Sequence, residues 1–229
     1  MIIVLGIDGL GSDIFLEALG TPGTPGMLEH LKGLKDTSAY SMHARADMST
    51  RSSENWGTHF YGNGPAYHGW YRSDEPVAVS GAISVFDVVG NSTGCTRWPP
   101  LVQKIPSFRL GGTACTLAAV RNRSNDLVVG VWDDVDDAGH AGSDRVAALK
   151  RVDGLIGTVL AARLPGDHVM VISDHGTRPC RWYEFACVAH YGGRTMELNT
   201  PLLVSGPGVS PGELKRPVTH QDTSRYILG

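Results

Sequence analysis

The residues whose types most clearly suggest chemistry are Asp174 and His175, which follow the apolar run Val169 to Ile172 after a single serine. Most of that run is β-branched, so it predicts a strand buried on both faces, with the acid and the imidazole at its carboxyl end. Carboxylate and imidazole groups are ligands that divalent metals such as zinc prefer. The pattern therefore predicts a metal site at this strand end.

A second apolar run, Ile2 to Ile7, ends in Asp8. It predicts a central parallel strand, and the carboxyl end of such a strand is where open α/β sheets bind ligands. An ordinary loop acid is the alternative for Asp8. The glycines between Gly6 and Gly11 lack the spacing of a dinucleotide-binding fingerprint, so we expect no dinucleotide there.

A third buried strand is predicted at Leu127 to Trp132, and an acidic segment follows it. Within that segment Asp136 and His140 are four residues apart, which places them on one face if the turn is helical. A solvated acidic loop is the alternative. The other acids of the segment fit a ligand spacing less well.

Hydroxyl residues cluster between Ser49 and Ser53, ahead of a predicted helix that includes Trp56 to Tyr61. Free backbone N–H groups at a helix start bind phosphate oxygens, and a serine there can attack phosphorus. Each of these hydroxyls also suits a helix cap, so Ser49, Thr50 and Ser53 stay open as alternatives to Ser52.

Together these residues can supply two sets of metal ligands. One set comprises Asp8, Asp174, His175 and the Ser52 oxygen, and the other comprises Asp136, His140 and one further histidine. Two divalent ions would lower the pKa of the Ser52 hydroxyl and neutralise charge on a phosphoryl group. Zinc is the expected metal, with Mn²⁺ and Mg²⁺ as alternatives.

The elements that must position these residues alternate between strands and helices, including a clear amphipathic helix over residues 143–162. This order predicts an α/β fold with a doubly wound, mostly parallel sheet flanked by helices. The 229 residues suit one domain spanning 1–229. Residues 95–110, rich in Pro and aromatic side chains, are expected to form a loop that covers the site and shapes the substrate pocket.

Charge and composition exclude several partners. A net charge of -3 gives no basic field for duplex nucleic acid, and no apolar stretch is long enough to predict a membrane span. The four cysteines, Cys95, Cys115, Cys180 and Cys187, lack CxxC spacing. We therefore expect a cytoplasmic protein with reduced thiols, although an even count permits disulfides. The sequence does not indicate the oligomeric state.

The motifs follow one another in a definite order: IDG, a serine at a helix start with Asn three residues later and His-Gly sixteen later, DxxxH, SDHG, and a His ahead of PLLVSGPGV. In this order, which covers most of the chain, they resemble the alkaline phosphatase superfamily and most closely its nucleotide pyrophosphatase/phosphodiesterase branch. The resemblance implies a two-zinc phosphodiesterase that forms a phosphoserine intermediate and acts on a nucleotide or another small phosphate ester.

Carried over residue by residue, the resemblance implies roles for individual side chains. It makes Ser52 the nucleophile, because Asn55 and His68-Gly69 fall at the family offsets. It makes Asp8, Asp174 and His175 the ligands of one zinc, and Asp136, His140 and His190 those of the other. His190 is favoured over His220 by its distance from Gly206-Pro207.

The chain also departs from the family pattern. It has a serine where the branch usually has threonine as nucleophile, and Ser73 stands where an asparagine usually holds a phosphate oxygen. Asn55, Arg72 and Ser73 are the expected substrate-binding residues. The segment between His68 and Asp136 is short, so we expect a compact protein with no large cap domain.

Other functions fit the sequence less well. A sulfatase would need Pro and Arg after its modified residue, and Ser52-Ser53-Glu54-Asn55 has neither. A phosphoglycerate mutase of the superfamily would carry a long inserted domain after its serine, and a chain of 229 residues is too short for one. A catalytically silent nucleotide or phosphate binder is disfavoured because every expected ligand is present. A phosphomonoesterase would need an extra cation, for which Arg51 and Arg72 are candidates, and we expect a diesterase instead.

Overall fold

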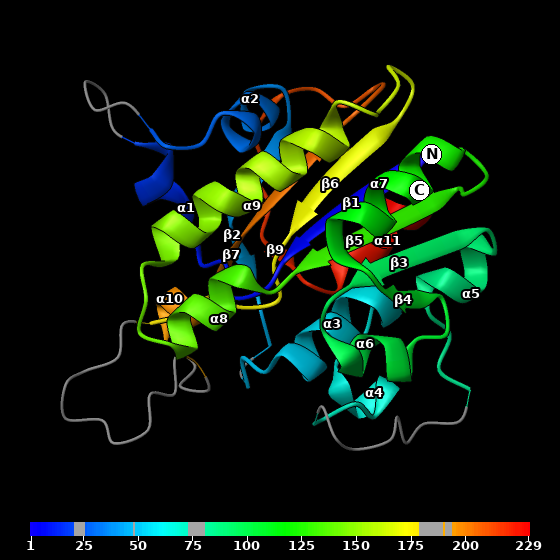
Figure 1. Ribbon diagram of the computed structural model, residues 1–229. Coiled ribbons are helices and arrows are strands. Elements are labelled where there is room, and N and C mark those ends of the chain that lie inside the picture. Colours follow the sequence, from blue (N-terminus) through cyan, green and yellow to red (C-terminus); the bar gives the residue numbers. More distant parts are fainter. Residues whose placement is uncertain (21–25, 48, 73–80, 179–189, 191–193) are drawn as a thin grey trace.

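Strand β1 (Ile2–Ile7) lies at the centre of a mixed sheet, and its parallel neighbours are β5 (Leu127–Trp132) and β6 (His168–Ile172). This is a computed structural model that describes residues 1–20, 26–47, 49–72, 81–178, 190 and 194–229. The described strands follow the order β4-β3-β5-β1-β6-β7-β2-β8, with β9 also beside β2. Three neighbouring parallel strands therefore form the middle of the sheet (Figure 1).

The outer strands extend the sheet on both sides. On one side β5 pairs in parallel with β3 (Ser92–Thr96), which pairs in parallel with β4 (Phe108–Leu110). On the other side β7 (Asn199–Ser205) runs antiparallel to both β6 and β2 (Ala39–Arg45). The short strands β8 (Gly212–Glu213) and β9 (Val218–Thr219) run parallel to β2. Most pairings are therefore parallel, as predicted.

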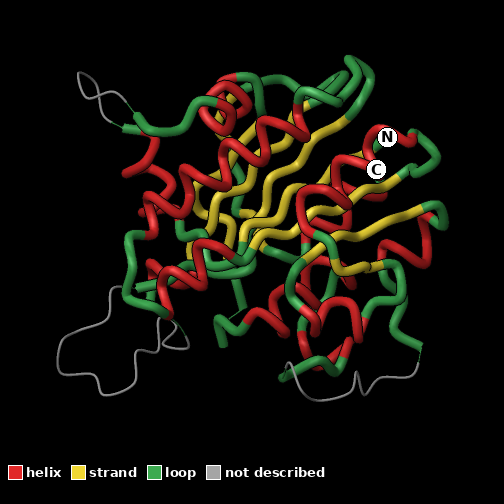
Figure 2. Tube along the Cα trace, viewed as in Figure 1, coloured by secondary structure: helices red, strands yellow, loops and turns green. Residues whose placement is uncertain are grey.

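Alternating side chains of β1 point into two separate cores. Ile3 and Leu5 pack into the core under one helical layer, while Val4 packs into the core under the other. The first layer comprises α1 (Ser12–Leu19), α2 (His30–Asp36), α7 (Gly112–Asn122), α8 (Asp134–His140) and α9 (Arg145–Leu160). The second comprises α3 (Ser52–Tyr61), α5 (Val85–Val89), α6 (Pro99–Lys104) and α11 (Asp222–Leu228). The predicted doubly wound fold is confirmed (Figure 2).

Two single turns complete the described helices: α4 (Pro65–His68) and α10 (Thr195–Leu198). In Figure 1 the carboxyl end of β6 points toward the side of the molecule where α8 and α10 lie. Segments from distant parts of the sequence therefore meet at this edge of the sheet.

The prediction of a covering loop at residues 95–110 is wrong. The segment contains the end of β3, helix α6 and strand β4. Pro99 occupies the first turn of α6, where its missing N–H has no cost, so here proline begins a helix. Leu101 and Phe108 are buried in the second core, and the segment is an integral part of the packed fold.

The expectation of reduced thiols is also wrong for one pair. Cys95 on β3 and Cys115 on α7 form a disulfide with a Cα–Cα distance of 5.7 Å. Their positions twenty residues apart carry no motif, and the packing of α7 against β3 brings them together. Cys180 and Cys187 lie outside the described residues. Among the described helices, none is long and apolar enough to cross a membrane.

Candidate metal centre and active site

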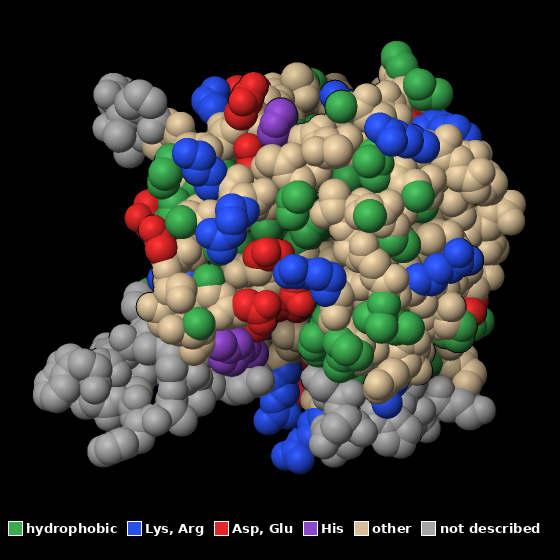
Figure 3. Space-filling model, viewed as in Figure 1, with side chains coloured by type: hydrophobic (Ala, Val, Ile, Leu, Met, Phe, Trp, Pro, Cys, Tyr) green, Lys and Arg blue, Asp and Glu red, His purple; other side chains and the backbone are tan. Residues whose placement is uncertain are grey.

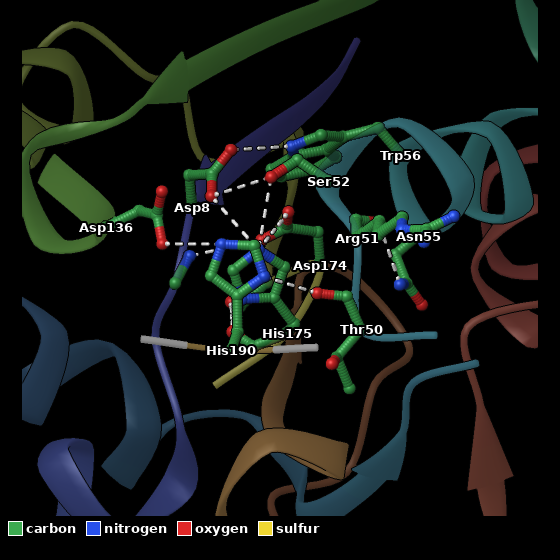
Figure 4. A network of polar contacts seen from close by, with 12 residues as sticks. Asp8, Thr50, Arg51, Ser52, Asn55, Trp56, Asp136, Asp174, His175 and His190 are labelled. Carbon is green, nitrogen blue, oxygen red and sulfur yellow. Dashed lines mark hydrogen bonds and ion pairs between the residues drawn. The ribbon is translucent and has the colours of Figure 1, made fainter. Parts of the chain in front are cut away.

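The predicted acids and histidines converge at the carboxyl edge of the three central strands. Asp8 follows β1, Asp136 lies on the helix after β5, and Asp174 and His175 follow β6. Parallel pairing aligns Ile7 with Trp132 and Gly6 with Ile172, so these strand ends lie side by side. Figure 4 shows the side chains pointing toward one another.

The first ligand group surrounds one nitrogen of His175. Its Nε2 atom lies 3.1 Å from Ser52 Oγ, 3.2 Å from Asp174 Oδ2 and 3.6 Å from Asp8 Oδ1. The Nδ1 atom lies 3.1 Å from the carbonyl oxygen of Gly176, which can only accept a hydrogen bond. When the imidazole is neutral, Nδ1 therefore carries the proton and Nε2 presents a lone pair to two carboxylates.

The second ligand group has the same character. His190 Nδ1 donates to the Thr50 carbonyl oxygen at 2.7 Å, so the neutral ring has an unprotonated Nε2. This atom lies 3.0 Å from His140 Nε2 and 3.6 Å from Asp136 Oδ1. Asp136 Oδ2 is also 3.2 Å from His140 Nε2. Potential ligand atoms of three side chains thus face one small space.

Asp136 joins the two groups. Potential ligand atoms of Asp136, His140 and His190 lie within 4.8 Å of one another, and so do those of Asp8, Asp136 and His175. The arrangement therefore resembles two adjacent cation sites bridged by one carboxylate.

Burial shifts the protonation of these groups. Burial, reinforced by the charges of Asp174 and Asp136, raises the pKa of Asp8 well above its ordinary value. Burial likewise raises the pKa of Asp174, although His175 opposes the shift. Burial and His175 lower the pKa of His190 to about 3. Several acids and the neutral imidazole of His190 thus share a buried space that a positive charge would stabilise.

Two buried carboxylate oxygens indicate that this group of residues suits divalent ions. Asp136 Oδ1 and Asp174 Oδ2 are buried and have no hydrogen-bond partner among the described residues. Unsatisfied buried carboxylate oxygens are costly, whereas metal coordination would satisfy them. Burial acts to raise the pKa of Asp136, but hydrogen bonding to His140 and the nearby histidines bring it below the ordinary value. The donors are all carboxylates and imidazoles, the set that zinc prefers.

Helix α3 positions Ser52 as its first residue, directly after the extended N-cap Arg51. Ser52 Oγ lies 3.4 Å from Asp8 Oδ1 in addition to its contact with His175. The neighbouring hydroxyls have other contacts, since Ser53 Oγ donates to the Tyr71 carbonyl oxygen and Thr50 Oγ1 to Glu197. Among these three hydroxyls, Ser52 is therefore the one that faces the ligand groups.

Asp8 is oriented by a residue that sequence reasoning missed. Trp56 Nε1 donates to Asp8 Oδ2 at 3.0 Å, and the indole is completely buried. Gly6 makes room for the indole, because a Cβ there would lie 2.6 Å from Trp56 Cη2. The signal in the sequence was a tryptophan one helical turn after Ser52.

The side chain of Asn55, a predicted substrate-binding residue, makes hydrogen bonds to the backbone around the start of α3. It is fully buried, its Oδ1 accepts from the Asp47 N–H at 2.7 Å, and its Nδ2 donates to the Arg51 carbonyl oxygen at 3.0 Å. These contacts hold the backbone that leads into α3, which favours a positioning role. Arg72 is exposed, and Ser73 lies outside the described residues.

The two other histidines of interest lie elsewhere in the fold. His220 Nε2 pairs with Thr200 Oγ1, and its ring stacks on His59 at 4.0 Å, so the structure brings His190 rather than His220 to Asp136. His68 is buried beneath Gly57, and burial lowers its pKa to about 4. Both histidines are part of the packing around α3.

The rim of the site is acidic. Arg97 at the end of β3 pairs with Asp133 and Asp134, and the side chain of His140 is 41% exposed. Figure 3 shows acidic side chains gathered beside a histidine on the face that carries α8. The second ligand group is therefore open to solvent through His140.

Comparison with solved structures places this arrangement in a known fold. A protein in the alkaline phosphatase superfamily from Vibrio parahaemolyticus matches with a TM-score of 0.67 and 14% identity, over 99% of this chain and 65% of that one. The chain has the alkaline phosphatase fold. Murine ectonucleotide pyrophosphatase/phosphodiesterase 5 matches with a TM-score of 0.73 and 13% identity, over 99% of this chain and 93% of that one. An inactive form of the murine protein has been solved with AMP.

A solved sulfatase structure is similar as well. A 2-O GAG sulfatase matches with a TM-score of 0.66 and 11% identity, over 96% of this chain and 67% of that one. A family model described as the Metalloenzyme superfamily matches residues 109–213, a range that includes Asp136, His140, Asp174, His175 and His190. A search of curated protein sequences gives no match. The predicted alkaline phosphatase-like fold is confirmed. The match to the Metalloenzyme superfamily model implies divalent metal ions as cofactors.

Proposed function

We propose that this protein is a metal-dependent phosphoric ester hydrolase that attacks with Ser52 and prefers phosphodiesters. The observation that carries the proposal is the position of the Ser52 hydroxyl at the start of α3, 3.1 Å from His175 Nε2 and 3.4 Å from Asp8 Oδ1. A nucleophile, a helix N-terminus and two ligand groups meet at one point, as phosphoryl transfer requires.

The two ligand groups would hold the metal ions. Asp8, Asp174, His175 and the Ser52 oxygen would bind one ion, and Asp136, His140 and His190 would bind the other. Bound divalent ions lower the pKa of a coordinated hydroxyl and neutralise charge on phosphoryl oxygens. Zinc suits this donor set best.

The side chains of the protein then divide the remaining work. The Ser52 oxygen attacks phosphorus and forms a phosphoserine, and the alcohol leaves with a proton. The N–H groups in the first turn of α3 have no partners within the helix, so they can bind phosphoryl oxygens. Water then cleaves the phosphoserine, which releases the phosphate product and restores the Ser52 hydroxyl. Trp56 keeps Asp8 in position through its indole N–H.

Charge favours a diester substrate. The site is surrounded by acids, and Arg51, which precedes Ser52, forms an ion pair with Glu54 at 3.2 Å. A monoester carries a second negative charge that would need a further cation. A diester carries one negative charge and suits this environment better. The AMP complex of the murine phosphodiesterase supports a nucleotide or a similar small phosphate ester as substrate.

Sulfate ester hydrolysis is the second candidate, because a sulfatase shares the fold. The sequence after Ser52 lacks the Pro and Arg that accompany the modified residue of sulfatases. We therefore expect no sulfatase activity.

The test compares three chromogenic substrates: bis-nitrophenyl phosphate, nitrophenyl phosphate and nitrophenyl sulfate. We expect the diester to turn over fastest and the sulfate not at all. Ser52→Ala should abolish turnover without changing metal content, while the matched variant Ser53→Ala should keep it, because Ser53 bonds to Tyr71 instead. Faster monoester turnover would reassign the protein as a phosphomonoesterase, and no turnover of any ester would indicate a silent binder.

A further inference from the structure

Thr50 has a backbone conformation that a β-branched residue rarely adopts. Its φ angle is 44°, in the left-handed region, and its side chain is completely buried. Among the described non-glycine residues, Arg123 is the other one with a positive φ. Strained backbone of this kind persists where surrounding contacts hold it, and such positions are frequent at functional sites.

The carbonyl group of Thr50 faces the second ligand group. Its oxygen accepts a hydrogen bond from His190 Nδ1 at 2.7 Å (Figure 4). A carbonyl oxygen cannot donate, so this bond requires the proton on Nδ1 and leaves the lone pair on Nε2. That lone pair points at the space shared with Asp136 and His140. Hydrogen bonds of this type orient metal-binding histidines and fix their tautomer.

The hydroxyl group of Thr50 contacts a different residue, Glu197. Thr50 Oγ1 donates to Glu197 Oε2 at 3.4 Å, and Glu197 is completely buried. The carboxylate of Glu197 also forms an ion pair with Arg178. The backbone carbonyl oxygen of Glu197 accepts a hydrogen bond from the Gly176 N–H at 2.8 Å. Glu197 is thereby anchored to the segment that follows His175, so it can hold the Thr50 turn in place.

We propose that Thr50, tethered by Glu197, is a positioning residue that aims His190 Nε2 at the cation site formed with Asp136 and His140. The inference rests on the proposed function, because it assumes that this group binds a metal. Since Thr50 lies two residues before Ser52, the same turn links the nucleophile to the second ligand group. Side-chain identity at Thr50 should therefore control metal affinity at one site and not at the other.

The direct test is calorimetric titration of metal-free Thr50→Gly with zinc chloride. Glycine adopts a positive φ without strain, which offsets part of the cost of losing the buried side chain and its hydrogen bond, so we expect only a small fall in melting temperature. Loss of the tether should weaken one of two zinc-binding events by about 10- to 100-fold and leave the other unchanged. Thr50→Ser keeps the hydroxyl and should bind both ions like the wild type.

Arg123→Gly is the matched control, because it replaces the other described non-glycine residue with positive φ. The Arg123 guanidinium makes two hydrogen bonds to Asp167, at 2.8 and 2.7 Å, away from the ligand groups. We expect this variant to have a lower melting temperature and unchanged affinities for both zinc ions. The inference is overturned if Thr50→Gly binds both ions like the wild type, if it loses both affinities together with stability, or if Thr50→Ser is as weak as Thr50→Gly.

A second measurement separates this inference from the proposed function. Nitrogen-15 NMR of the imidazoles in the metal-free protein reports the tautomer of His190 without any metal. A proton on Nδ1 is the expected result, and a proton on Nε2 would overturn the positioning role. A wild-type protein that binds fewer than two zinc ions would instead contradict the proposed function.

Discussion

Buried carboxylates in two regions of this molecule are treated in opposite ways. Asp153 on α9 accepts hydrogen bonds from the backbone N–H groups of Glu29, His30 and Leu31, at 2.9, 3.2 and 2.7 Å. Asp167 accepts two hydrogen bonds from Arg123. Both acids have their negative charge balanced by the protein alone.

At the carboxyl edge of the sheet the acids are not balanced in this way. Asp8, Asp136 and Asp174 crowd together, and two of their oxygens have no hydrogen-bond partner in the described part of the chain. A fold that satisfies acids elsewhere leaves these ones facing one another. The difference indicates that the first kind of acid stabilises the fold, whereas the second kind is arranged for a cation.

Of the changes that test this difference between the two kinds of acid, metal removal should have the largest effect on activity. Dialysis against a chelator is expected to abolish ester hydrolysis, and added zinc should restore it. The melting temperature should fall on metal removal, because ions that bind the folded chain stabilise it. Full activity in protein shown to be free of metal would contradict the claim that these acids are arranged for a cation.

Substitution of the shared ligand should come next. Asp136→Asn keeps the shape of the side chain but removes the charge that both ligand groups use. We expect a loss of about 1,000-fold or more in kcat/KM. In the metal-free protein the variant should lose some stability, because the histidines that lower the pKa of Asp136 favour its charged form. Chromogenic diester assays and thermal melts measure the two quantities, and near-normal turnover by the variant would contradict the shared role of Asp136.

Asp153→Asn should show the opposite pattern. The carboxylate binds the N-terminus of α2, so its neutralisation is expected to lower the free energy of unfolding by about 2 kcal/mol. Activity at a temperature well below the melting point should not change. Denaturant unfolding and the diester assay check this, and reduced kcat with normal stability would contradict it.

The pH dependence of stability should differ in sign between the two regions. Arg123 lowers the pKa of Asp167 to about 2, so the stabilisation from Asp167 is present above the unfolded value of 3.8 and is lost as pH falls through 2. Burial raises the pKa of Asp8, so in the metal-free protein Asp8 reduces stability as pH rises above 3.8.

Two single variants separate these contributions. Asp167→Asn should remove about 1 kcal/mol at neutral pH and flatten the curve below pH 4, whereas Asp8→Asn should stabilise the metal-free protein above pH 4. Unfolding measured between pH 2 and 7 gives both curves. If the stability of the two variants changed with pH in the same way, the proposed difference between the two kinds of acid would be wrong.

Much of the site could be predicted from sequence because its residues follow continuous apolar runs. Such runs identify buried parallel strands, and the acid after each run must then lie at one edge of the sheet. Asp8 and Asp174 were found in this way, and the helical spacing of Asp136 and His140 added the second group.

The remaining features depend on tertiary contacts that leave no local pattern. The Cys95–Cys115 disulfide needs α7 to pack on β3, and Asn55 is occupied by backbone groups that only the fold brings to it. Trp56 and Glu197 act on residues far away in the sequence. Proline and aromatic residues in the segment 95–110 predict a loop, but Pro99 lies in the first turn of a helix, so the prediction of a loop is wrong.

The most direct test of the account is anomalous scattering at the zinc edge from crystals of the zinc-loaded protein. We predict two peaks, one among Asp8, Asp174, His175 and Ser52 and the other among Asp136, His140 and His190. Absence of both peaks, or peaks bound elsewhere on the chain, would contradict the claim that these side chains form a two-metal centre beside Ser52.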